Sequence, residues 1–101
     1  MIYGVVSVRV KPGKLKEYLA LFTSIAGKVR EEKGCVQYVS AMDFEIGAPN
    51  QSLDKNMVTI LEKWESLEAL QKHLAMPYMG DFFKKEGNYV ESTVLKMLQE
   101  V

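Results

Sequence analysis

Apolar and polar residues alternate along the start of the chain and then change to a longer period. Over residues 2–10 the period is two, which predicts a β-strand. Residues 11–13 (KPG) are a turn signal, because proline fixes φ and glycine frees it. From 14 to 33 the apolar residues recur three and four positions apart, which predicts a long amphipathic helix with Gly34 as its left-handed cap. Its apolar stripe comprises Leu15, Tyr18, Leu19, Phe22, Ile25, Ala26 and Val29.

Three more strands are predicted further along the chain. Residues 35–46 and 57–64 are rich in β-branched and aromatic side chains, which favours strands. Residues 47–56 contain Gly, Pro, Asn, Ser and Asp, so they form the loop of a hairpin. Residues 88–98 close the chain as the last strand.

A second helical region is predicted between the third and fourth strands. Ser66 suits the N-cap of a helix that runs to about Met76. Pro77 either stops this helix or begins a new turn, and a second short helix ends at Gly87. In the helix that begins after Ser66, the apolar stripe comprises Leu67, Leu70 and Leu74. His73 lies on the flank of this stripe.

The order β-α-β-β-α-β predicts one domain over residues 1–101 with a ferredoxin-like α+β fold. In this fold a four-stranded antiparallel sheet carries both helices on one face. The other face should be polar if it met water, yet Tyr3, Val5, Met57 and Leu61 fall on it. We therefore expect a second copy to pack against this face, giving a homodimer with a barrel-like centre.

The composition narrows the classes of function. The 13 basic and 13 acidic residues balance to a formal net charge of zero, whereas nucleic-acid binding needs a concentrated positive field. No apolar run is long enough for a bilayer, and the first ten residues resemble a strand more than a signal peptide. Cys35 is the only cysteine, which excludes an internal disulfide and favours the reducing cytoplasm. The expected partner is a small molecule or a protein, with neither nucleic acid nor membrane.

Several kinds of catalytic site lack the residues that they need. Cys35 and His73 are the only cysteine and histidine and lie 38 positions apart, which argues against a zinc site. No glycine-rich loop is present for a nucleotide phosphate, and no G-x-S-x-G segment marks a nucleophilic serine. We therefore expect no metal and no tightly bound NAD, FAD or ATP. A Cys35–His73 catalytic pair is conceivable, although Cys35 suits a structural place at the start of a strand.

Three residues near the third strand have both a structural and a functional interpretation. Trp64 is either a core residue or the wall of a pocket. Glu62 faces inward from the same strand; it either pairs with a backbone group, Lys84 or Arg9, or serves as a pocket carboxylate. His73 is either a structural side chain or a partly buried base.

The segment 76–79, together with Phe82 and Phe83, is apolar and contains two methionines. It is either a flexible lid over a pocket or ordinary core supplied by a short helix. Tyr78 and Phe82 are the candidate residues of such a lid.

Residues 62–78 carry a resemblance to a known family. They read EKWESLEALQKHLAMPY, and Glu62, Trp64, His73 and Tyr78 keep fixed places in the pattern E-x-W-x-S-x-E-A-L-x-x-H-L-x-x-P-Y. This pattern resembles the antibiotic biosynthesis monooxygenase (ABM) family. The KPGK after the first strand, the EEKGC at 31–35 followed by a tyrosine, and the strand at the end of the chain agree in order and spacing. The branch most similar in these motifs is that of the bacterial quinol monooxygenases.

The resemblance implies a dimeric α+β barrel with a pocket between the helices and the sheet. The best-described members of the family oxygenate electron-rich dihydroxyaromatic compounds without metal or flavin. A hydroquinone that loses a proton can give an electron to O₂ directly, so the protein has to hold the anion, admit O₂ and exclude water. By the same resemblance, Trp64 corresponds to a pocket residue and Lys84 to a basic one.

The chain also departs from two branches of the family. In the polyketide-oxidising members an asparagine and a tyrosine stand at the positions of Ile60 and Leu70, so their particular mechanism does not carry over. The haem-degrading branch has a histidine at about the position of Phe83 and an asparagine at about that of Val6, and this chain has neither.

The principal hypothesis is a cofactor-independent monooxygenase that oxidises a quinol-like or other electron-rich aromatic molecule with O₂. His73 is the expected proton acceptor, Trp64 a pocket wall and Lys84 the stabiliser of the anion. The residues expected to bind the substrate are Glu62, Tyr78, Phe82, Ile60 and Leu70. Two alternatives are an isomerase of a small polyhydroxy compound, in which the histidine shuttles a proton, and a non-catalytic small-molecule binding module.

Overall fold

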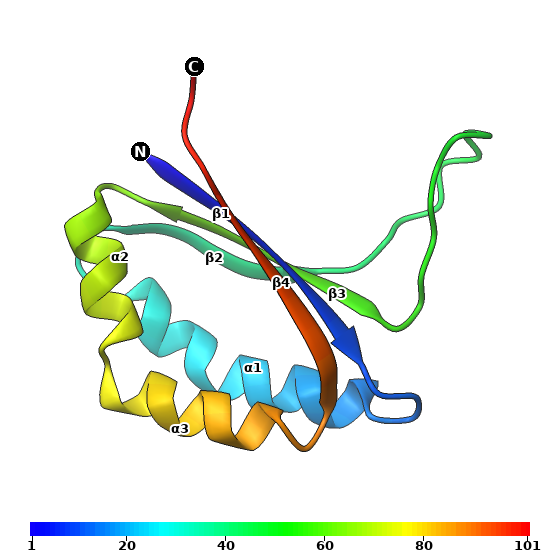
Figure 1. The fold of residues 1–101 in the computed structure, drawn as a ribbon, viewed down its shortest axis with the longest axis horizontal. Coiled ribbons are helices and arrows are strands. Elements are labelled where there is room, and N and C mark those ends of the chain that lie inside the picture. Colours follow the sequence, from blue (N-terminus) through cyan, green and yellow to red (C-terminus); the bar gives the residue numbers. More distant parts are fainter.

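One antiparallel sheet and three helices make up the fold. The structure is a computed structural model that describes residues 1–101. The elements are β1 (Ile2–Val10), α1 (Leu15–Arg30), β2 (Cys35–Ala41), β3 (Met57–Trp64), α2 (Leu67–Leu74), α3 (Pro77–Glu86) and β4 (Val90–Leu98). The strands pair in the order β2-β3-β1-β4, and all three helices lie on one face of the sheet (Figure 1). The predicted ferredoxin-like α+β fold is confirmed.

The first helix turns its predicted stripe toward the sheet but ends earlier than expected. Its buried residues are Tyr18, Phe22, Ile25, Ala26 and Val29. The helix stops at Arg30, and Gly34 follows four residues later with a φ of +89°. A Cβ atom on Gly34 would lie 2.5 Å from the Cβ of Ala69. Gly34 therefore serves a left-handed turn and a close approach to α2 at the same time.

The second helical region consists of two helices, α2 and α3, which meet at Pro77. Ser66 is the N-cap of α2, and its Oγ accepts a hydrogen bond from the backbone N–H of Ala69 at 3.1 Å. Met76 has an extended backbone, and Pro77 is the first residue of α3. Proline suits this position because its missing N–H would be unpaired there in any case.

The predicted apolar stripe of α2 is correct at Leu70 but wrong at Leu67 and Leu74. Leu67 is 56% exposed and Leu74 is half-exposed, whereas Leu70 and His73 are the buried residues of this helix. The inward face of α2 is therefore centred between these two positions. The spacing of the three leucines predicted a different inward face, because it did not count the polar His73 as a core residue.

Strand β2 is shorter than the predicted 35–46. Its last pair joins Ala41 to Thr59, and β3 begins only at Met57. Without a neighbouring strand, Phe44 and Ile46 are 80% and 72% exposed. The segment between β2 and β3 projects from the body of the molecule (Figure 1). None of the helices has the length and hydropathy that crossing a bilayer requires.

The face of the sheet opposite the helices carries apolar side chains, as predicted. The register places Val94 across from Ser7 and Leu98 across from Tyr3, on the side that no helix covers. Val94 and Leu98 are about half-exposed. The expected homodimer through this face stays a prediction.

Candidate functional site

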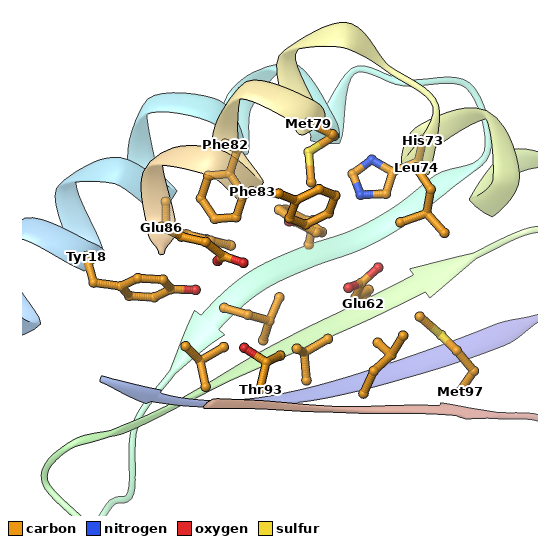
Figure 2. A pocket seen from close by; sticks show the side chains of 16 residues that line it. Tyr18, Glu62, His73, Leu74, Met79, Phe82, Phe83, Glu86, Thr93 and Met97 are labelled. Carbon is orange, nitrogen blue, oxygen red and sulfur yellow. The ribbon is translucent and has the colours of Figure 1, made fainter. Parts of the chain in front are cut away.

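A cavity of about 140 Å³ lies between the helices and the sheet (Figure 2). Most of its 16 lining residues are hydrophobic. Leu74, Phe83 and Leu95 line it and are each about half-exposed. The cavity therefore opens to solvent through an apolar mouth, a form typical of small-molecule sites.

The periodicity of each element decides which side chains reach the cavity. Strand β3 alternates strictly between buried and half-buried residues, so Ile60 and Glu62 point to the same side. Helix α3 directs Met79, Phe82 and Glu86 inward, because residues three and four positions apart share one face.

A buried carboxylate holds His73 from behind. Nδ1 of His73 lies 3.0 Å from Oε2 of Glu32, and the two side chains are 2% and 7% exposed. The hydroxyl of Tyr78 donates a hydrogen bond to the same oxygen. Burial, followed by this hydrogen bond, raises the pKa of Tyr78, so the phenol stays protonated. Glu32 thus joins the end of α1 to α2 and to the start of α3.

This arrangement fixes the direction of the imidazole. An acceptor at Nδ1 favours the tautomer with its proton on that nitrogen, which leaves a lone pair on Nε2. Nε2 makes no hydrogen bond within the chain, and the only enclosed side-chain polar atom without a partner is Oε1 of Glu32. Because His73 lines the cavity, its Nε2 is available to a ligand.

Aromatic rings pack around the imidazole. The Trp64 ring lies 4.6 Å from that of His73 at a tilt of 31°, and the Tyr38 ring meets it edge-on at 5.5 Å. The Trp64 Nε1–H donates a hydrogen bond of 2.8 Å to Oε1 of Glu62. The second oxygen of Glu62 has no partner in the chain and faces the cavity. Arg9, one of the expected partners of Glu62, instead pairs with Asp54 at 3.0 Å.

The structure brings four of the eight predicted site residues to the cavity wall. These are His73, Glu62, Ile60 and Phe82. Trp64 and Leu70 are buried but do not line the cavity, and Tyr78 lies behind His73.

Lys84, the eighth predicted residue, is exposed and does not line the cavity. It lies two positions from both Phe82 and Glu86, which point inward, and therefore occupies another side of α3. The structure thus gives Lys84 no contact with a ligand in the cavity.

Sequence reasoning missed the carboxylate that holds His73 and the polar groups elsewhere in the cavity. Glu32 lies three residues after buried Val29, just beyond the end of α1, where the spacing of the inward stripe would place the next inward side chain. Glu86 follows Phe82 by four residues, and the apolar stripe predicted for the first helix includes Tyr18 but assigns no role to its hydroxyl. Helical spacing was the available signal for both glutamates.

Cys35 plays no visible part in the cavity. It begins β2, outside the lining residues, and burial raises the pKa of its thiol. No group of three or more His, Cys, Asp or Glu side chains converges in a way that could hold a metal ion.

A ferredoxin-like domain with an apolar cavity and a few polar groups in its wall defines a small-molecule-binding α+β protein. The family model described as antibiotic biosynthesis monooxygenase matches residues 1–85. The chain belongs to the antibiotic biosynthesis monooxygenase family, and this membership supports a function of the monooxygenase type.

Individual relatives agree with this assignment. The chain is 30% identical over 99 residues to the Escherichia coli (strain K12) protein named "Probable quinol monooxygenase YgiN", covering 96% of this chain and 91% of that one. The crystal structure of a conserved protein from Methanosarcina mazei Go1 has a TM-score of 0.86 at 22% identity, covering 99% and 92%. Protein SO0527 from Shewanella oneidensis has a TM-score of 0.85 at 24% identity, covering 98% and 89%. The two structures show the same fold.

Proposed function

We propose that the protein is a monooxygenase that oxidises a quinol-like or other electron-rich aromatic molecule with O₂, without metal or flavin. One observation carries the proposal: His73 borders an apolar cavity with Nδ1 held by buried Glu32 and Nε2 unpaired. A base in this position can take the proton of a ring hydroxyl. Family membership and the name of the E. coli relative support the choice of reaction.

The proposed reaction begins with transfer of a hydroxyl proton to Nε2 of His73. The electron-rich anion gives an electron to O₂, and the two radicals combine to form a C–O bond. Cleavage of the O–O bond leaves one oxygen atom on the ring and releases the other as water, which takes up the proton. A dihydroxy ring and O₂ thus give a hydroxyquinone and water, and the substrate supplies all the electrons that reduce O₂.

The other side chains have supporting roles in this proposal. Glu32 and Tyr78 hold the imidazole, and Trp64 packs against it. Ile60 and Phe82 are apolar walls that exclude water from the anion.

The test is oxygen consumption with 1,4-dihydroxynaphthalene, followed by mass spectrometry of the product formed under ¹⁸O₂. We expect one labelled oxygen in the hydroxyquinone, and a His73→Ala variant that falls to the autoxidation rate. Lys72→Ala, an exposed change in the same helix, should keep the wild-type rate.

Three results would contradict the proposal in different ways. Release of H₂O₂ with no label in the ring would indicate an oxidase. Loss of turnover after chelation, restored by one metal, would refute independence from metals. Conversion that continues without O₂ would indicate an isomerase instead.

We also propose that the protein is a homodimer through the open face of the sheet. Val94 and Leu98 on β4 and Leu61 on β3 share this face, and β4 is an edge strand. Exposed apolar groups beside an unpaired edge favour association. Light scattering should give twice the mass of one chain, and Val94→Lys should shift it toward a single chain. A wild-type mass of one chain would contradict the dimer.

A further inference from the structure

The cavity has polar groups at a second place, away from His73 and Glu62. Figure 2 shows Tyr18 and Glu86 at one end and Glu62 and His73 toward the other. Tyr18 comes from α1, and Glu86 is the last residue of α3. Figure 2 draws the Tyr18 hydroxyl and the Glu86 carboxylate toward one another, and burial, followed by the charge of Glu86, raises the pKa of the Tyr18 phenol. We call Tyr18 and Glu86 the distal pair.

The fold itself gives no reason for a carboxylate at position 86. The C-terminus of a helix is its negative end, where an acidic side chain is unfavourable. Glu86 makes no ion pair or hydrogen bond through its side chain, although Lys84 and Lys85 precede it on the same helix. Burial raises its pKa. A titratable group that lines a cavity at such a cost, without a partner, is a candidate for ligand contact.

Tyr18 supplies a donor beside this carboxylate. Its side chain is 1% exposed, yet its hydroxyl has no hydrogen-bond partner in the chain. That hydroxyl is not sealed in the core, since Oε1 of Glu32 is the only enclosed side-chain polar atom without a partner. Burial raises the pKa of Tyr18, so the phenol keeps its proton. The hydroxyl therefore faces the cavity as a free donor.

The register of the sheet places the two sets of polar groups at different levels along β1. Glu62 lies across from Gly4, and Thr93, which lines the distal end, lies across from Val8. These levels are four residues apart on β1, or about 13 Å of strand at ~3.3 Å per residue. Side chains from both ends reach into this space. A ring system with a polar atom at each end matches it better than a single hydroxyl would.

We propose that the distal pair is a second hydrogen-bonding site, which takes an oxygen substituent at the end of the ligand remote from His73. The proposal rests on the proposed function and narrows its substrates to ring systems with oxygen at both ends. Tyr18 donates to that oxygen, and Glu86 accepts the hydrogen of a hydroxyl. After oxidation the carbonyl oxygen still accepts from Tyr18. The site therefore recognises both the reduced and the oxidised form.

The test compares two ligands by calorimetry under anaerobic conditions, where no turnover occurs. 1,4-Dihydroxynaphthalene has both oxygens, and 1-naphthol has one. Tyr18→Phe removes the donor, and Glu86→Gln replaces the charged acceptor by a weaker neutral one, each with little change of shape. Each variant should bind the dihydroxy compound about 2–10-fold more weakly, the range of one hydrogen bond. Binding of 1-naphthol should be unchanged, and Lys85→Ala should alter neither ligand.

Two outcomes overturn the assignment. In one, both variants bind the dihydroxy compound as tightly as the wild type does. In the other, each variant loses the same factor for both ligands, so that the effect does not depend on the second oxygen. Because binding is measured without O₂, either result leaves the monooxygenase proposal standing. Conversely, failure to incorporate oxygen leaves the two-ended binding site intact.

Discussion

Replacing Glu32 by alanine should both destabilise the protein and disable His73. Oε2 of Glu32 accepts hydrogen bonds from Nδ1 of His73 at 3.0 Å and from the Tyr78 hydroxyl, in a place where the side chains are nearly enclosed. Alanine leaves both donors without a partner. An unsatisfied buried donor costs about 1–3 kcal/mol, so the two together should lower the free energy of unfolding by about 2–6 kcal/mol. A loss of 2 kcal/mol would already lower Tm by roughly 8 °C or more in a domain of this size.

Urea unfolding of a double-mutant cycle measures this contact. Tyr78→Phe alone should cost about 1 kcal/mol, since it removes one hydrogen bond. In the Glu32→Ala background the same change should cost almost nothing, because the hydroxyl there has no acceptor. If Tyr78→Phe costs the same in both backgrounds, or if Glu32→Ala loses less than about 0.5 kcal/mol, the three side chains do not form the described contact.

Glu32→Gln separates the positioning role from stability. The amide keeps the shape and one acceptor oxygen, but a neutral acceptor binds the imidazole more weakly than a carboxylate does. We expect kcat to fall about tenfold or more, within the range that a general base contributes, while KM changes little. Unchanged kcat in a folded Glu32→Gln variant would show that the carboxylate only stabilises the fold.

Three further predictions concern pH and local geometry. Burial raises the pKa of Glu86, so the stability due to this group is complete below the usual glutamate range and is lost as pH rises through the raised value. Glu86→Gln should therefore gain stability relative to wild type as pH rises above the usual glutamate pKa of about 4.3, and a constant difference in urea titrations would contradict this. Gly34→Ala should lose about 2 kcal/mol or more, since φ is +89° and the new Cβ would meet that of Ala69 at 2.5 Å. Gly13→Ala, with φ of +79° and open space around it, isolates the backbone part of that loss, so an equal effect would refute the clash. Ser66→Ala should lose about 1 kcal/mol by thermal unfolding, because it removes the N-cap bond of α2; an unchanged Tm would contradict that role.

Local periodicity was enough to predict the fold, except where an element depends on a neighbour. The alternation in β1 and the spacing in α1 are properties of each segment alone. The end of β2 is not a property of its segment alone. Phe44 and Ile46 continue the pattern of the strand, but no strand lies beside them. The inward face of α2 likewise depends on what can pair with His73, and that partner lies 41 residues away.

The candidate site could be predicted only in part for the same reason. Rarity and spacing singled out Trp64 and His73, the only tryptophan and the only histidine, and the structure places their rings 4.6 Å apart. Glu32 was missed because a charged residue near the end of a helix is usually solvent-exposed. Its spacing of three residues from buried Val29 indicated an inward-facing side chain. The role of that side chain depends on His73, which comes from a different helix.

The break between α2 and α3 is what allows these residues to meet. A continuous helix over residues 67–86 would be about 30 Å long at ~1.5 Å per residue, and it would carry residue 78 straight past the end of α1. The extended backbone at Met76 and the proline at the start of α3 let the chain change direction instead. The hydroxyl of Tyr78 can then reach the same oxygen of Glu32 that Nδ1 of His73 contacts. Pro77, the strongest helix-breaking signal in this region, is therefore part of the way in which the fold aims the imidazole at the cavity.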